Sequence, residues 1–165
     1  MTTEGAEGSV DRRVEAELRS LSVAYAFAAD AGDGGRFADL FVPEGELVVP
    51  NFPTDLRPVV TRAGHEALGQ IPEALQRYHR TFHLLGESEY AVHGDEATGL
   101  VQCLAHHVLG GDDRSSGDGR AGTDVVWFIR YEDLYRATGS GWRIGRRVLH
   151  LQWVEERPVT VVGGS

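Results

Sequence analysis

Apolar residues recur every three or four positions near the start of the chain, which is the spacing of one face of an α-helix. This apolar stripe consists of Val14, Leu18, Leu21, Tyr25 and Ala28. Ser9 or Asp11 can cap the start of the helix, because a short polar side chain accepts a hydrogen bond from an otherwise unpaired backbone N–H. The helix is expected to end at the glycine-rich run 31–35, since glycine readily adopts the left-handed conformation of a helix C-cap.

The pattern in the following segment is less regular. It predicts a short second helix over 36–41, a brief strand over 46–49, and an irregular, proline-containing segment over 51–58. A third helix is expected over 62–78, where apolar residues return to helical spacing. Pro72 falls inside this third helix and is expected either to kink it or to begin a second helical segment.

From Arg80 onward, apolar and polar residues alternate, which indicates β-strands with one buried face. The strands predicted in this way span residues 80–92, 96–109, 123–137 and 141–155. Hairpin turns are expected at 94–95 and at 138–141, while the polar, glycine-rich segment 110–122 is expected to form a mobile loop.

Helices followed by consecutive antiparallel strands predict an α+β fold. A strongly curved sheet that wraps around the N-terminal helices would enclose a cavity, and such cavities are common places for a small-molecule ligand. The chain length favours a single domain, which we place at residues 10–157, with a flexible tail at 1–9 and a C-terminal tail at 158–165.

The composition excludes several kinds of chemistry. The chain has 165 residues with 16 Lys+Arg against 25 Asp+Glu, a formal net charge of −9, and all 16 of the Lys+Arg residues are arginine. Without lysine, neither a lysine Schiff base nor a lysine-containing phosphate loop is available. The acidic balance also argues against a nucleic-acid partner, because nucleic-acid-binding domains present a basic face to the phosphates.

The sequence gives no signal for export or membrane insertion. Residues 1–10 lack a basic region followed by an apolar one, and no segment approaches the ~18 apolar residues that cross a bilayer. We therefore expect a cytoplasmic protein without a membrane partner. Cys103 is the only cysteine, so it cannot form an internal disulfide, and it is interpreted as a small buried strand residue.

Asp30 and His83 are candidates for acid–base chemistry. Asp30 falls in the last turn of the first helix, where the helix dipole disfavours a carboxylate by a few tenths to about 1 kcal/mol. His83 lies on the strand face opposite Phe82 and Leu84. If the two side chains met, the carboxylate would fix the imidazole tautomer and make the histidine a general base. The alternatives are a solvent-exposed Asp30 and a structural His83.

His106 and His107 are adjacent on a strand, so they point to opposite faces. This arrangement is unlike the paired histidines of a helical metal site, and neither a metal nor another cofactor is expected. Which of the two faces the cavity is left open, because a one-residue slip exchanges the two faces of a strand.

Several segments resemble the SnoaL-like branch of the nuclear-transport-factor-2-like superfamily. The segments that carry this resemblance are residues 21–41, 81–83, 131–136 and 141–144. The resemblance covers residues 10–155. It implies a cone-shaped α+β barrel, in which N-terminal helices pack into a strongly curved mixed or antiparallel sheet around a pocket. It also implies a homodimer or homotrimer.

The resemblance implies roles for particular residues. Scytalone-dehydratase-like enzymes, bile-acid dehydratases and hexachlorocyclohexane dehydrochlorinase use an Asp–His pair as the base, and Asp30 and His83 fall at the corresponding places. Tyr25 matches a tyrosine of the bile-acid dehydratase type, and His107 matches a histidine that polarises the substrate oxygen. The implied catalytic residues are therefore Asp30, His83, Tyr25 and His107. The expected substrate-binding residues are Tyr131, Arg146, Trp127 and His106.

Two positions qualify this assignment. Arg146 shares the alternation phase of Trp142 and Ile144, so it would face inward, where it could stabilise an anionic group. The alternative is a surface arginine beside Arg147. Ile129 stands where a polar pocket residue of scytalone dehydratase is expected, so that enzyme's own substrate is not expected here.

The expected function is that of a cofactor-independent, dehydratase-type lyase or isomerase with an Asp–His base. Its expected substrate is a hydrophobic, oxygenated, polycyclic or polyketide-like molecule. One alternative is a polyketide cyclase that uses the same pocket. The other is a non-catalytic small-molecule-binding protein or the small subunit of an oxygenase.

Overall fold

The computed structural model describes residues 11–110 and 120–161. Its helices are α1 (Arg12–Ala31), α2 (Gly34–Ala38) and α3 (Gly64–Leu75). Its strands are β1 (Phe41–Asn51), β2 (Asp55–Ala63), β3 (Arg80–His93), β4 (Glu96–Leu109), β5 (Arg120–Thr138) and β6 (Gly141–Val161).

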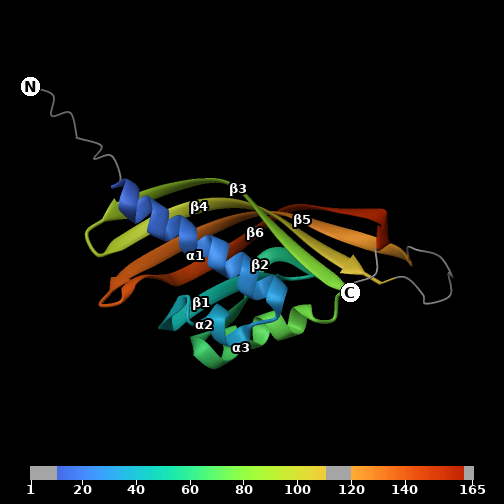
Figure 1. Ribbon diagram of the computed structural model, residues 1–165, viewed down its shortest axis with the longest axis horizontal. Coiled ribbons are helices and arrows are strands. Elements are labelled where there is room, and N and C mark those ends of the chain that lie inside the picture. The colour runs from blue at the N-terminus through green and yellow to red at the C-terminus, as the bar shows by residue number, and fades with distance from the viewer. Residues whose placement is uncertain (1–10, 111–119, 162–165) are drawn as a thin grey trace, which may run out of the picture.

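The described strands form one sheet in the order β2-β1-β6-β5-β4-β3. Neighbouring strands are antiparallel except for the parallel pair β1 and β6. The sheet is strongly curved but does not close, so β2 and β3 are its edges. Helix α1 crosses the front of the sheet, and α2 and α3 lie together beside it (Figure 1). The predicted α+β fold with a curved mixed sheet is confirmed.

Helix α1 has the boundaries that its sequence suggests. Asp11 caps its start by accepting a hydrogen bond from the backbone N–H of Arg13 at 2.9 Å. Gly32 ends it with φ 70°, the left-handed conformation that glycine adopts without a steric cost. The apolar stripe of α1 packs against the inner face of the sheet, which we define as the face turned toward the helices. Residues Leu18, Leu21, Tyr25 and Ala28 of this stripe are buried.

The region between α1 and α3 differs from the sequence prediction. The second helix ends at Ala38 rather than at residue 41, and β1 is longer than the strand expected over 46–49. Much of the segment 51–58, expected to be irregular, belongs to β2. The prolines of this hairpin are tolerated because β2 is an edge strand and the β1–β2 register shifts on both sides of Pro50.

The long strands are found as predicted, with different ends. Strand β6 continues past residue 157 and pairs with β5 as far as Val161, so the expected boundary between the domain and a C-terminal tail is wrong. The expected third helix, 62–78, is shorter at both ends, and Pro72 lies within it. The N-terminal tail 1–9 and most of the loop expected over 110–122 lie outside the described residues.

A bulge in β6 determines which of its side chains face inward. Leu134 pairs with Arg146 and Tyr135 pairs with Ile144, which leaves Gly145 without a partner in the β5–β6 ladder. Because the extra residue shifts the side-chain alternation by one, Arg147 points inward and Arg146 points outward.

The outer face of the sheet carries exposed apolar side chains. Phe82, Leu84 and Trp153 are each at least half exposed, and the Trp153 ring stacks on Phe128 with centroids 4.2 Å apart.

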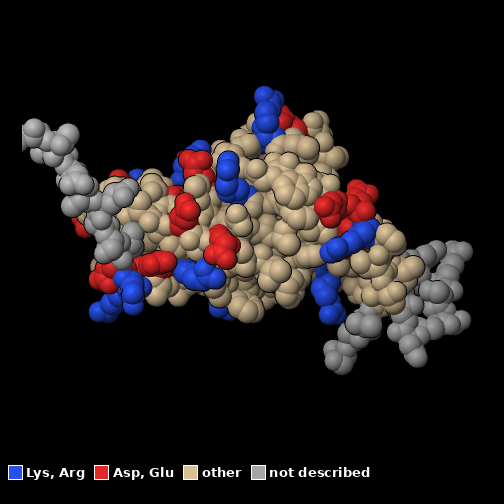
Figure 2. All heavy atoms as spheres, turned by 90° about the horizontal axis from the view of Figure 1, so that it is seen from above, with Lys and Arg blue, Asp and Glu red and all other residues tan. Residues whose placement is uncertain are grey.

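On the face shown in Figure 2, acidic and basic side chains are interspersed rather than separated by sign. No helix in the described part of the chain is long and apolar enough to cross a membrane. The expected homodimer or homotrimer stays a prediction.

Candidate active site

A cavity of about 290 Å³ lies on the inner face of the sheet, and every helix and strand except α2 contributes to its wall. Most of the wall is aliphatic or aromatic. Its polar or partly polar side chains are Tyr25, Asn51, Arg62, Arg77, His83, His107, Trp127 and Tyr131. An apolar cavity with a few converging polar groups is the usual form of a small-molecule site.

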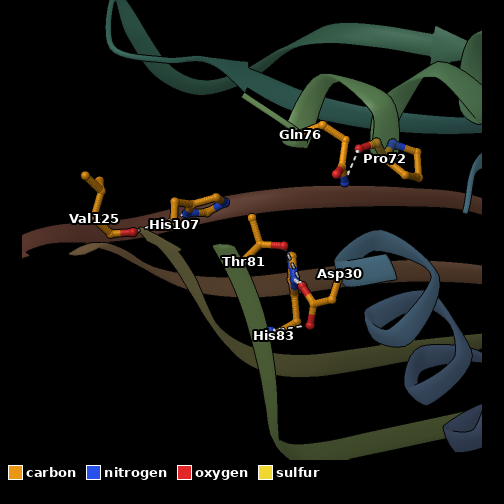
Figure 3. A network of polar contacts seen from close by, with 7 residues as sticks. All are labelled: Asp30, Pro72, Gln76, Thr81, His83, His107 and Val125. Carbon is orange, nitrogen blue, oxygen red and sulfur yellow. Dashed lines mark hydrogen bonds and ion pairs between the residues drawn. The ribbon is translucent and has the colours of Figure 1, made fainter. Parts of the chain in front are cut away.

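Asp30 and His83 are in direct contact beside this cavity (Figure 3). Asp30 Oδ1 lies 2.6 Å from His83 Nδ1, and it also accepts a hydrogen bond from the Thr81 hydroxyl at 2.9 Å. Asp30 Oδ2 accepts from the backbone N–H of His83 at 2.9 Å. The Asp30 carboxylate therefore holds His83 both by its imidazole ring and by its backbone N–H.

The fold explains why an acid occupies the last turn of α1. Strand β3 is an edge strand, so the backbone N–H of His83 points away from the sheet and needs an acceptor. Asp30 supplies that acceptor. Burial by itself raises the pKa of the Asp30 carboxyl, but the hydrogen bonds and charge of His83, together with the Thr81 bond, outweigh burial and hold the pKa below its usual value.

The hydrogen bond to Asp30 also selects the tautomer of His83. A carboxylate only accepts, so Nδ1 carries the proton and Nε2 of the neutral ring has a free lone pair. His83 lines the cavity, whereas Asp30 lies behind it and is not part of the wall. This geometry suits a general base that is positioned by a carboxylate.

His107 also lines the cavity, and its ring centroid lies 6.1 Å from that of His83. Its Nδ1–H donates to the Val125 carbonyl at 3.2 Å. Burial, reinforced by the nearby charge of His83, lowers the pKa of His107 to about 4, so it is neutral at pH 7. In this tautomer Nε2 accepts a hydrogen bond, and His107 can therefore receive one from a substrate hydroxyl.

The cavity wall also supplies hydrogen-bond donors. The Trp127 indole N–H is buried and has no partner among the described residues. Tyr25 and Tyr131 are buried beside each other, with ring centroids 5.7 Å apart. Burial raises the pKa of Tyr25 to about 12, which keeps its hydroxyl protonated at neutral pH. All three side chains line the cavity, so they are candidate donors to an oxygen of a bound molecule.

A buried charge network that the sequence analysis missed supports the two tyrosines. The Arg147 guanidinium lies over both rings, 4.3 Å from the Tyr25 centroid and 4.4 Å from that of Tyr131. It forms two hydrogen bonds of 2.7 Å to Asp133 and one of 2.8 Å to Ser22. The signal that could have indicated Asp133 is its alternation phase, which it shares with the inward-facing Tyr131.

Two expected substrate-binding residues lie outside the cavity. His106 points to the outer face of the sheet, where its Nδ1 lies 2.7 Å from Asp124. Arg146 also points outward and pairs with Glu46 at 3.3 Å, because the bulge at Gly145 reverses the expected alternation. The inward orientation expected for Arg146 is therefore wrong, and of the two adjacent histidines it is His107 that faces the cavity.

The remaining expected residues line the cavity or support it. Trp127 and Tyr131 belong to its wall, together with Tyr25, and Ile129 is part of the wall too. Cys103 is buried, as predicted, and burial raises the pKa of its thiol to about 12. Over residues 11–110 and 120–161, no group of three His, Cys, Asp or Glu side chains is arranged to hold a metal ion.

Comparison with known proteins agrees with this fold. The model of the SnoaL-like domain family matches residues 11–148. The chain belongs to this family. This match confirms the resemblance to the SnoaL-like branch that the sequence analysis identified. A search of the curated proteins finds no match.

Solved structures share the SnoaL-like fold at low sequence identity. A candidate aromatic ring hydroxylase from Novosphingobium aromaticivorans superposes with a TM-score of 0.73 at 18% identity, covering 90% of this chain and 96% of that one. A candidate scytalone dehydratase from the same species gives 0.69 at 19% identity, covering 92% and 93%. Hexachlorocyclohexane dehydrochlorinase LinA-type3 from Novosphingobium barchaimii gives 0.70 at 15% identity, covering 88% and 91%.

These similarities show that the chain shares the fold of those proteins.

Proposed function

We propose that the protein is a cofactor-independent lyase or isomerase of the dehydratase type, in which His83 removes a proton beside a carbonyl group. The observation that carries this proposal is the Asp30–His83 pair, with its 2.6 Å hydrogen bond at the wall of an apolar cavity. A carboxylate that fixes the tautomer and orientation of an imidazole is a common way to position a general base.

The reaction follows from the groups around the cavity. His83 Nε2 takes the proton, and the oxygen of the developing enolate accepts hydrogen bonds from the Trp127 N–H and the Tyr131 hydroxyl. A hydroxyl group beta to the carbonyl is held by His107 Nε2 and then departs. The proton on His83 passes to this departing group, so that water leaves, the new double bond forms and His83 returns to its neutral state.

The cavity also bears on the class of substrate. Its volume of about 290 Å³ lies at the small end of the range for ligand pockets, and its wall is largely apolar. We therefore propose a small cyclic substrate that is hydrophobic apart from its oxygens. This volume favours dehydration of such a molecule over cyclisation of a long polyketide chain.

The test is to screen cyclic β-hydroxycarbonyl compounds for loss of water, followed by the absorbance of the conjugated product. His83→Gln should lower turnover by about 10²- to 10⁴-fold, and Asp30→Asn should also lower it strongly. His65→Gln is the matched control, because His65 pairs with Asp39 at 2.9 Å but both side chains are exposed. Unchanged turnover in both His83→Gln and Asp30→Asn would rule out the proposed base.

A further inference from the structure

The cavity wall carries positive charge, although the protein as a whole is acidic. It contains two guanidinium groups, those of Arg62 on β2 and Arg77 just after α3, and no carboxylate. The protein as a whole carries a formal charge of −9. A positively charged lining in an acidic protein needs a reason, and an anionic ligand supplies one.

Neither Arg62 nor Arg77 has a carboxylate within 4.0 Å among residues 11–110 and 120–161. Six other arginines in the described chain do have such a partner, and six have none; what distinguishes Arg62 and Arg77 is that they line the cavity. Both cavity arginines are exposed, whereas Tyr131 in the same wall is buried. The two arginines are thus an exposed, solvent-facing part of the cavity lining.

Arg77 is held at this place by a series of aromatic rings. Its guanidinium lies 4.9 Å from the ring centroid of Tyr78 and donates to the Tyr78 hydroxyl at 2.9 Å. The Tyr78 ring packs on His107 at 4.8 Å, and His107 packs on Trp127 at 4.9 Å. The cation is therefore fixed to the same wall that carries the proposed polar contacts.

We infer that the substrate carries a carboxylate, which Arg62 and Arg77 bind at the mouth of the cavity while the apolar ring lies against Trp127 and its reactive C–H group faces His83. This inference rests on the proposed function. A guanidinium presents N–H donors in a planar fork that matches two carboxylate oxygens. A carboxylate bound there leaves the ring inside and the charge near solvent.

The test uses unreactive probes and measures binding by calorimetry. The probes are 2-naphthoate, the neutral 2-naphthamide of nearly equal shape, and 2-naphthyl phosphate. Wild type should bind the carboxylate about tenfold more tightly than the amide. Arg62→Gln and Arg77→Gln should each remove most of this preference, and Arg62→Lys should keep part of it. Arg57→Gln is the matched control on the same strand, because Arg57 pairs with Asp55 and lies outside the cavity.

The outcomes separate this inference from the proposed function. Equal binding of carboxylate and amide, no binding of the carboxylate, or a preference that survives Arg62→Gln/Arg77→Gln would overturn it. Tighter binding of 2-naphthyl phosphate than of 2-naphthoate would also overturn it, because the site would then prefer a substrate that carries a phosphate group. His83→Gln should keep the carboxylate preference while losing turnover, so each result bears on one claim only.

Discussion

Replacing Arg147 by methionine should strongly destabilise the fold. The Arg147 side chain is fully buried and forms two 2.7 Å hydrogen bonds to Asp133, which is buried as well. Methionine fills similar space but leaves the Asp133 charge without its partner. Breaking a buried pair from one side costs about 3–5 kcal/mol, a large share of the roughly 5–15 kcal/mol that stabilises a typical domain.

The neighbouring residue provides the control. Arg146 pairs with Glu46 at 3.3 Å, but both side chains are nearly half exposed. An ion pair of this kind contributes at most about 1 kcal/mol, so Arg146→Met should have a small effect. A second variant tests the cause: Arg147→Met/Asp133→Asn removes the unpaired charge and leaves the Asn amide oxygen to accept the Tyr135 hydroxyl. It should recover most of the lost stability.

Urea unfolding at pH 7, followed by circular dichroism, measures these differences as shifts of the midpoint at constant slope. Arg147→Met should unfold at a much lower urea concentration than Arg146→Met. The reasoning fails if the two single variants unfold within about 1 kcal/mol of each other. It also fails if the double variant is no more stable than Arg147→Met, because the loss would then come from packing rather than from a buried charge.

Two further predictions concern pH and close packing. Because the pKa of His107 is about 4 when folded and near 6.5 when unfolded, the unfolded chain binds more protons between these values, so stability should fall as the pH drops from about 6.5 to about 4. His107→Phe should flatten this slope in urea unfolding measured across that range, and an unchanged slope would contradict the assignment. Gly34→Ala should cost about 1–3 kcal/mol, because a Cβ there would lie 2.1 Å from the backbone oxygen of Gly69. Gly35→Ala, with its nearest contact at 3.8 Å, should be tolerated, and equal melting temperatures for both variants would refute this explanation.

The parts of the fold that could be predicted are those with regular side-chain periods. The helical stripe predicts that Tyr25 is buried, and the alternation predicts that His83 lies on the strand face opposite Phe82 and Leu84; the structure confirms both. Both predictions depend only on local geometry, which the sequence carries directly. The pairing of Asp30 with His83 came from the family resemblance, because residues so far apart in the chain reveal no contact by spacing alone.

The parts that could not be predicted depend on single-residue irregularities. Alternation placed Arg146 inside, but one unpaired residue, Gly145, exchanges it with Arg147. The same ambiguity left His106 and His107 undecided. A bulge has no reliable sequence signal, because it is determined by how two strands pair. Site residues that lie on strands are therefore the ones whose orientation is easiest to miss.

Asp30 performs two tasks that one substitution should separate. Its carboxylate binds the free backbone N–H at the sheet edge, and it fixes the proton of His83 on Nδ1. In Asp30→Asn the amide oxygen can still accept from the backbone, but the amide N–H₂ group now faces Nδ1. The imidazole should then take the opposite tautomer, with the proton on Nε2, where it blocks proton abstraction. Nitrogen NMR of the labelled imidazole should show this exchange while the melting temperature changes little. A ring that keeps its Nδ1 proton in a variant without activity would mean that the carboxylate acts through its charge rather than by orienting the base.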